Sequence, residues 1–291
     1  MKPEDFDLLA GILKDRSGLS ISQDKVYLLE SRLTPVARKN NLEDLDQLIK
    51  EVRLKKTEAL LHDITEAMTT NESFFFRDAT PFEIFEKTIM PKMLEQRASK
   101  KSLRIWSAAC STGQEAYSLA MILREMAPKL AGWRIEIVGT DISKEVLEKS
   151  KAGIYSQFEV QRGLPINYLM KYFTQVSELW QIDAAIRAMV TYKEFNLLKD
   201  LKSLGTFDII FCRNVLIYFD QETKGKVLDR ICDLMPNDGL LFLGGAETVL
   251  GISDKFKPVP NFRGIYQVSK AKEEDAFENH PAVIASTQAG G

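Results

Sequence analysis

The stretch Leu103–Glu115 constrains the fold of this chain more than any other part of the sequence. It reads LRIWSAACSTGQE, which is an apolar run typical of a buried parallel strand, a turn of small residues and the start of a helical pattern. A strand, a tight turn and a helix in this order present free backbone N–H groups and the positive helix end to a ligand. The pattern therefore predicts a ligand-binding turn in an α/β fold.

A second apolar strand, Arg134–Gly139, ends in Thr140-Asp141. An acidic side chain at the end of the second strand is where a doubly wound sheet binds ribose hydroxyls. Asp141 could instead cap the helix that begins next to Ser143, but its place at the carboxyl end of a strand favours the ribose contact. Together with the turn, it predicts a cofactor that contains a nucleoside.

The composition of the turn indicates which nucleoside cofactor binds. Ala109–Gly113 contains one glycine, whereas a dinucleotide site usually needs G-x-G-x-x-G so that the backbone can approach a pyrophosphate. No phosphate-binding loop with the pattern G-x-x-x-x-G-K-[ST] follows the strand either. S-adenosylmethionine carries no phosphate, and the turn favours it. A nicotinamide-dependent oxidoreductase, supported by Asp141, is the alternative.

Two further polar residues lie at the start of a predicted helix and at the end of a predicted strand, and each has two interpretations. Glu115 fits a capping box with Thr112 as the N-cap, T-x-x-E, and its spacing favours this structural role over a contact with the amino group of a cofactor. Asn196 ends the third strand, where its amide could pair with an adenine edge or cap a turn, and neither alternative is favoured.

The fourth strand, 207–212, is followed by Arg213 and Asn214, at the edge where open sheets bind ligands. In the apolar run after them, Tyr218 is the side chain that could place a polar group in the cleft. These positions complete a predicted site at the carboxyl edge of the sheet.

The order of apolar patterns predicts the domain organisation. Strands and helices alternate after residue 99, which indicates a mainly parallel sheet covered on both faces. We expect strands over 103–109, 134–139, 190–196, 207–212, 239–244 and 264–268, and helices over 114–126, 143–151 and 221–235. We expect a helical domain over 1–70, a linker over 71–98, a catalytic domain over 99–269 with an inserted subdomain at about 153–189, and a disordered tail over 270–291.

The predicted linker begins with Asn71–Arg77, NESFFFR. Three consecutive phenylalanines fit neither a helical stripe nor a strand, so we interpret them as a hydrophobic plug between the domains. The polar residues around them, Asn71, Ser73 and Arg77, would then face a cavity. Thr80-Pro81-Phe82-Glu83 predicts an N-cap, a proline in the first turn and a capping Glu for a helix over 81–97.

The composition limits the classes of partner. The 291 residues carry a formal net charge of −2, which gives no argument for nucleic-acid or membrane binding. The three cysteines are interpreted as reduced core thiols. With no signal peptide and no spanning segment in the sequence, we expect a cytoplasmic protein. We also expect a monomer and no metal site.

Four motifs together resemble one family, the chemotaxis receptor-glutamate O-methyltransferases, CheR. They are NESFFFRD (71–78), WSAACSTGQEAYSLAM (106–121), GTDIS (139–143) and FDIIFCRNVLIYF (207–219). The resemblance implies a Rossmann-like class I methyltransferase sheet with an all-helical N-terminal domain and a small β subdomain. It also implies that S-adenosylmethionine is the cofactor and that glutamates on the cytoplasmic helices of chemoreceptors are methyl-esterified.

The resemblance also implies the site residues and replaces the capping interpretation of Glu115. The cofactor would contact Asn71, Ser73, Arg77, Glu115, Asp141, Asn196, Leu197, Arg213 and Asn214. Arg77 and Tyr218 match the residues beside the transferring methyl. Ser73 stands where the family often has Thr and keeps the hydroxyl.

Acceptor chemistry and receptor binding complete the predictions. A glutamate is already ionised at neutral pH, with an ordinary pKa of about 4.3. Displacement on the methyl group therefore needs no general base, and we assign no role to His62 or His280.

Some family members grip a receptor pentapeptide with a glycine-containing loop. Because 173–182 has no glycine, we predict direct binding to the methylation helices.

The sequence bears on two other classes of protein. A nucleic-acid methyltransferase is disfavoured because no Pro-Pro-aromatic pattern follows the fourth strand and the chain is not basic. A protein that senses the cofactor without transferring the methyl group remains an alternative.

Overall fold

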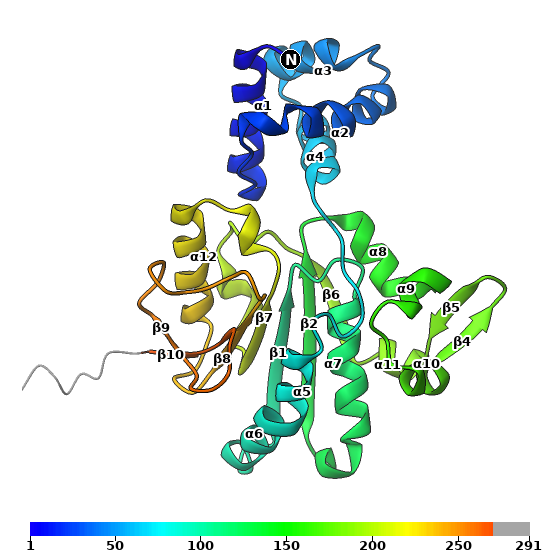
Figure 1. Ribbon diagram of the computed structural model, residues 1–291, viewed down its shortest axis with the longest axis vertical. Helices are drawn as coiled ribbons and strands as arrows, with labels where there is room; N and C mark the ends of the chain where they lie inside the picture. Colours follow the sequence, from blue (N-terminus) through cyan, green and yellow to red (C-terminus); the bar gives the residue numbers. More distant parts are fainter. Residues whose placement is uncertain (270–291) are drawn as a thin grey trace, which may run out of the picture.

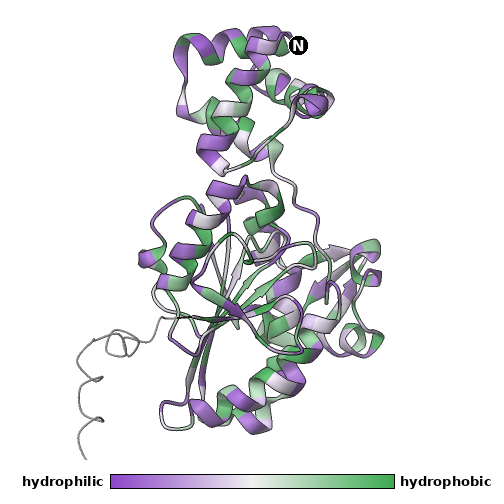
Figure 2. Cartoon of the chain, turned by 60° about the vertical axis from the view of Figure 1, so that its left-hand side comes forward, coloured by the Kyte–Doolittle hydropathy of each residue, from purple (hydrophilic) through white to green (hydrophobic). Residues whose placement is uncertain are grey.

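The computed structural model describes residues 1–269. In it, a helical N-terminal domain sits over one edge of an α/β domain (Figure 1). The predicted disordered tail, 270–291, and His280 lie outside the described residues. In Figure 2 hydrophobic and hydrophilic residues alternate along the helices of both domains, as expected of helices that pack one face on a core.

The N-terminal domain contains four α-helices and a short 3₁₀ turn. They are α1 (Pro3–Ser17), η1 (Gln23–Lys25), α2 (Val26–Lys39), α3 (Leu45–Lys55) and α4 (Glu58–Met68). Their apolar stripes meet in one cluster, in which Leu9, Leu13, Leu29 and Leu33 are fully buried. Gly18 ends α1 with a left-handed backbone, φ 78°, which a glycine adopts without steric cost.

The linker differs from its prediction at its start and in its middle. The helix begins at Thr80 itself, and no side chain caps it, so the predicted capping box of Thr80 is wrong. It runs as α5 (Thr80–Ile84), a π-helical turn η2 (Phe85–Ile89) and α6 (Met90–Gln96). Pro91 has no N–H to donate to the carbonyl four residues earlier, which explains why the turn before it is widened.

The phenylalanine plug is buried in part as predicted, but its rings pack in the core of the α/β domain and not between the two domains. Phe75 and Phe76 are buried in the main core, whereas Phe74 stays half-buried. The Phe75 ring makes edge-to-face contacts with Tyr155 and Phe173, at centroid distances of 5.0 and 5.5 Å. These contacts attach the linker to the inserted subdomain.

The α/β domain has a sheet of seven strands in the order β6-β2-β1-β7-β8-β10-β9. The first five pair in parallel, and β10 runs antiparallel to both β8 and β9. The bounds are β1 (Ser102–Ala108), β2 (Arg134–Asp141), β6 (Val190–Glu194), β7 (Ile209–Cys212), β8 (Leu240–Leu243), β9 (Phe256–Pro258) and β10 (Ile265–Val268). The order reverses between β1 and β7, which is where a doubly wound sheet binds its ligand.

Helices cover both faces of this sheet, which confirms the predicted Rossmann-like fold. The helices and turns are α7 (Gln114–Glu125), η3 (Ala127–Leu130), α8 (Lys144–Ala152), η4 (Leu201–Leu204), η5 (Leu216–Tyr218) and α12 (Gln221–Asp233). Successive strand residues point to opposite faces, so Ile105 packs in one core cluster and Trp106 in the other. The three cysteines are buried, and none of them forms a disulfide within the described residues.

The inserted subdomain contains three strands and three short helices. Its elements are β3 (Ile154–Ser156), α9 (Gln157–Gln161), α10 (Ile166–Tyr172), β4 (Phe173–Val176), β5 (Leu179–Ile182) and α11 (Ala184–Arg187). β3 joins the β4–β5 hairpin to make a three-stranded antiparallel sheet, which projects from the domain in Figure 1. The sequence did not reveal β3 because three residues are too few to show alternation.

The N-terminal domain contacts the carboxyl edge of the large sheet. Ser20 N–H donates to the Tyr218 carbonyl at 2.9 Å, and the Glu66 carboxylate accepts from the Ser143 hydroxyl at 2.8 Å. Lys14 and Asp220 form an ion pair at 2.7 Å. Among the described residues, none of the helices combines the length and apolarity that crossing a bilayer requires.

Candidate active site

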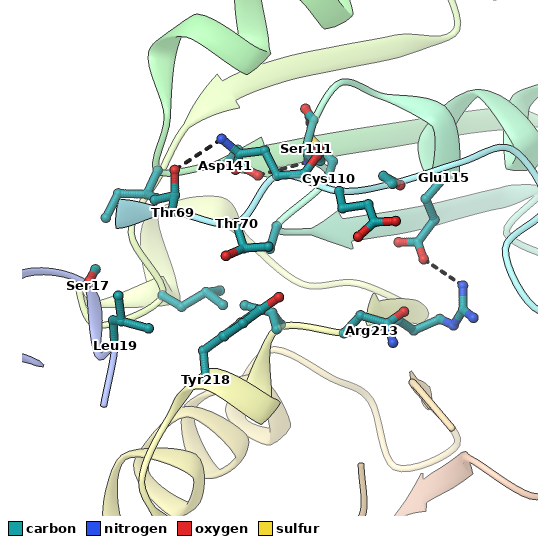
Figure 3. Close-up of a pocket in the computed structure, with 18 of the residues that line it drawn as sticks. Ser17, Leu19, Thr69, Thr70, Cys110, Ser111, Glu115, Asp141, Arg213 and Tyr218 are labelled. Atoms are coloured by element: carbon teal, nitrogen blue, oxygen red, sulfur yellow. Dashed lines mark hydrogen bonds and ion pairs between the residues drawn. The ribbon is translucent and has the colours of Figure 1, made fainter. Parts of the chain in front are cut away.

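A cavity opens at the carboxyl ends of β1 and β7, under the N-terminal domain. Figure 3 shows Glu115 and Asp141 on one side of it and Tyr218 on the opposite side. The structure brings all the nominated residues to its lining: Asn71, Ser73, Arg77, Glu115, Asp141, Asn196, Leu197, Arg213, Asn214 and Tyr218. Positions separated by almost 150 residues in the sequence therefore share one site.

The turn after β1 alternates between two backbone conformations. Ala109, Ser111 and Gly113 are left-handed, with φ of 53°, 51° and 94°. Only one of these three positions is a glycine, and a non-glycine residue in this region costs about 1–2 kcal/mol. The turn thus has the backbone of a glycine-rich loop but keeps two Cβ atoms where a pyrophosphate would need room.

Thr112 does not cap the helix that follows, so the predicted T-x-x-E capping box is wrong. The N-cap of α7 is Gly113, which has no side chain, and the Thr112 hydroxyl donates instead to Gln114 Oε1 at 2.8 Å. Glu115 is consequently free to point across the cavity.

The Asp141 carboxylate accepts two backbone N–H groups. Its Oδ2 accepts from Ser111 at 2.8 Å and its Oδ1 from Ser143 at 3.0 Å. Burial raises the pKa of Asp141 above its ordinary value, and the N–H groups of Ser143 and Ser111 partly oppose that rise. The helix α8 is capped by Ser143, so the N-cap alternative for Asp141 is not what the structure shows.

Glu115 and Arg213 form a buried ion pair beside the cavity. Glu115 Oε2 lies 3.1 Å from an Arg213 terminal nitrogen, and its Oε1 accepts from the Ser107 hydroxyl at 2.8 Å. Burial raises the pKa of Glu115, while the Arg213 charge opposes the rise. The Arg213 side chain is 1% exposed, and its Nε–H has no partner among the described residues. A buried donor without a partner is costly, so this group fits an acceptor on a ligand.

Arg213 also holds the linker against the sheet. Its second terminal nitrogen donates to the Arg77 carbonyl at 2.9 Å and to Asp78 Oδ2 at 2.7 Å. Around Arg77 the backbone is left-handed at Phe76, Asp78 and Ala79. The tight turn persists because the contacts of Arg213 and the buried Phe76 ring fix both of its ends.

The polar residues of the linker, Asn71, Ser73 and Arg77, each have a different environment. The Ser111 hydroxyl donates to the Asn71 carbonyl at 2.6 Å, which ties the linker to the turn after β1. Arg77 is half-buried and donates to the Glu72 carbonyl at 3.1 Å. Ser73 lines the cavity between them.

The Asn196 amide is engaged on both sides. Its Nδ2 donates to the Arg16 carbonyl at 2.6 Å, and its Oδ1 accepts from Leu198 N–H at 2.9 Å. The turn-capping alternative is therefore the arrangement seen, together with a contact to the N-terminal domain. Leu197 is buried and forms part of the wall.

Sequence reasoning missed two parts of the site. The first is the roof from the N-terminal domain: Ser17, Leu19, Met68, Thr69 and Thr70. No local pattern relates these residues to the sheet, because domain packing brings them there. The second is Glu247, whose carboxylate binds the backbone after β7. An acidic residue following the strand 239–244 is the signal that could have found it.

Comparisons with known proteins agree with this geometry. The family model described as CheR methyltransferase, SAM binding domain, matches residues 71–265, and that described as CheR methyltransferase, all-alpha domain, matches residues 4–69. Chemotaxis protein methyltransferase Cher2 of Pseudomonas putida is 36% identical over 270 residues, covering 91% of this chain and 98% of the relative. Chemotaxis protein methyltransferase 1 of Pseudomonas aeruginosa is 37% identical with the same coverage.

Proposed function

The chain belongs to the CheR methyltransferase family, and on that premise we propose that it esterifies glutamate side chains on the cytoplasmic helices of chemoreceptors. Membership makes it an S-adenosylmethionine-dependent methyltransferase of chemotaxis and excludes the nicotinamide-dependent oxidoreductase. The identity of the acceptor, the roles of single residues and a cytoplasmic location are parts of the proposal.

The cavity residues fit S-adenosylmethionine in charge. The buried Arg213 Nε–H without a partner suits a carboxylate, and the Glu115 carboxylate suits an ammonium group. Asp141 keeps unused acceptor lone pairs for ribose hydroxyls, although two N–H groups already bind it. The bound cofactor supplies a methyl group on a sulfonium, which is electrophilic without further activation.

One observation supports a carboxylate as the methyl acceptor. The cavity is lined by a cation, Arg77, and by a phenol, Tyr218. A glutamate is ionised at neutral pH, so no residue must remove a proton from it. Arg77 would pair with the acceptor carboxylate, and the Tyr218 hydroxyl would orient its attacking oxygen. Catalysis then rests on alignment in a partly desolvated cavity.

Transfer of a tritiated methyl group to receptor-containing membranes tests the proposal. We expect base-labile label, which marks an ester, and its loss in Arg77→Ala. Arg162→Ala is the matched control, because both guanidinium groups lie over the Phe74 ring, but Arg162 does not line the cavity. Near wild-type turnover of Arg77→Ala would remove Arg77 from the chemistry, and base-stable label would refute the glutamate acceptor.

The basic residues of the N-terminal domain would steer an acidic receptor helix. Several of them are already paired, as in Arg53–Asp5, Lys39–Asp63 and Lys55–Glu51. Arg38 and Lys50 form no ion pair within the described residues and are exposed, so they are the stronger candidates for docking.

We also propose that receptor binding does not use a C-terminal pentapeptide. In the β4–β5 hairpin, Ser177 takes the left-handed position, φ 56°, in a segment that lacks glycine. A pull-down with a receptor tail peptide tests this: tight binding that depends on the tail would contradict the proposal.

A further inference from the structure

The carboxylate of Glu247 accepts four backbone N–H groups at the edge of the cavity. Its Oε2 accepts from Asn214 and Gly244, both at 2.7 Å, and its Oε1 from Val215 at 3.0 Å and Ile217 at 3.3 Å. Glu247 itself is half-buried and does not line the cavity. One side chain thus joins the end of β8 to the segment that follows β7.

That segment, 213–218, carries four lining residues, Arg213, Asn214, Val215 and Tyr218, and has little regular structure of its own. Its only regular secondary structure is the three-residue 3₁₀ turn η5. Asn214 is left-handed, with φ 60°, so the chain turns sharply directly after the strand. Without the Glu247 carboxylate, the backbone N–H groups of Asn214, Val215 and Ile217 would lose their acceptor in a partly buried region.

The neighbouring glycine shows how closely this junction is packed. A Cβ added to Gly244 would lie 2.7 Å from Asn214 Nδ2 and 2.7 Å from Glu247 Oε2. An added Cβ would therefore displace the Asn214 amide or the Glu247 carboxylate from these positions, so the junction as it stands favours glycine. The carboxylate, the glycine and the left-handed Asn214 therefore form one fitted unit.

We propose that Glu247 is a positioning residue, which sets the backbone of 213–218 so that Arg213 and Asn214 meet the cofactor and Tyr218 meets the acceptor. It acts through four N–H groups and not by touching either substrate. The kinetic part of this inference rests on the proposed function, whereas the part on cofactor binding does not.

Glu247→Gln tests the inference with almost no change in volume. An amide nitrogen cannot accept a hydrogen bond, so the N–H groups now shared by Oε1 or Oε2 lose their acceptor. We expect at least tenfold weaker binding of S-adenosylhomocysteine by calorimetry, and at least tenfold faster amide exchange within 213–218. The turnover number should fall further, because Tyr218 moves with the segment.

Glu159→Gln is the matched control. Its carboxylate also accepts a backbone N–H, from Ser156 at 2.8 Å, and pairs with Lys149 at 2.7 Å, but it lies in the inserted subdomain. We expect the two variants to lower the melting temperature alike, while only Glu247→Gln weakens the ligand. A merely structural role of Glu247 would reduce the folded fraction and leave the dissociation constant of folded protein unchanged.

Gly244→Ala provides a second perturbation of the same junction if Glu247→Gln fails to fold. It should reproduce the faster local exchange and the weaker ligand binding with the carboxylate still present. Ligand affinity and turnover within twofold of wild type in the folded variant would overturn the inference. A wild-type protein that binds S-adenosylhomocysteine but esterifies no receptor would refute the proposed function instead, and the exchange and affinity data would still decide the role of Glu247.

Discussion

Replacing Asp141 by Asn separates the structural from the ligand-binding role of this carboxylate. Asn keeps one oxygen acceptor, so one of the N–H bonds from Ser111 and Ser143 loses its partner. A hydrogen bond to a charged group contributes about 1.5–3 kcal/mol. Burial opposes this loss, since it raises the pKa of Asp141 and so penalises the ionised form that Asn removes. We therefore expect a small change in stability, about 1 kcal/mol, or roughly 2–4 °C in melting temperature.

Ligand binding has no such compensation. The ribose hydroxyls would lose a charged acceptor, which at about 1.5–3 kcal/mol corresponds to roughly 10- to 150-fold weaker binding. Calorimetry with S-adenosylhomocysteine measures the affinity, and thermal melting measures the stability. Asp44→Asn is the control, because Asp44 caps α3 through the Gln47 N–H, far from the cavity, and Asn caps equally well. A folded Asp141→Asn protein that binds within twofold of wild type would refute the ribose role.

Three further predictions test other parts of the structure. Binding of S-adenosylhomocysteine should weaken as the pH falls through the raised pKa values of Glu115 and Asp141, because only the ionised Glu115 attracts an ammonium and only the ionised Asp141 is a charged acceptor for the ribose; calorimetry across pH should show this slope, and Glu115→Gln should reduce it to the part that Asp141 contributes. Phe75→Ala should cost about 3–5 kcal/mol in urea unfolding, since the ring is fully buried against Tyr155 and Phe173, and a loss below 1 kcal/mol would contradict the plug. Asn196→Ala should raise the dissociation constant only a few-fold, because its amide binds Arg16 and Leu198; a hundredfold loss would indicate a direct adenine contact.

The sheet was predictable because its signals are local. A buried parallel strand is an apolar run, and β1, β2 and β7 each have one. The edge strand β9 and the short β3 were missed, since a three-residue strand lacks a period. Caps were predicted less well. Thr80 and Thr112 have the expected residue types, but packing of the linker and the left-handed Gly113 decided where α5 and α7 begin.

The sequence by itself determined where ligand groups stand along each strand, because polar residues that follow apolar runs must emerge at one edge of a parallel sheet. The positions of Asp141 and Arg213 at this edge follow from this rule alone. Only the tertiary structure decided what those groups do there. It pairs Arg213 with Glu115, gives the Asn196 amide to the N-terminal domain, and brings Glu247 under the backbone of 214–217. These contacts join distant parts of the chain, and a hydrogen bond between residues far apart leaves no periodic trace in the sequence.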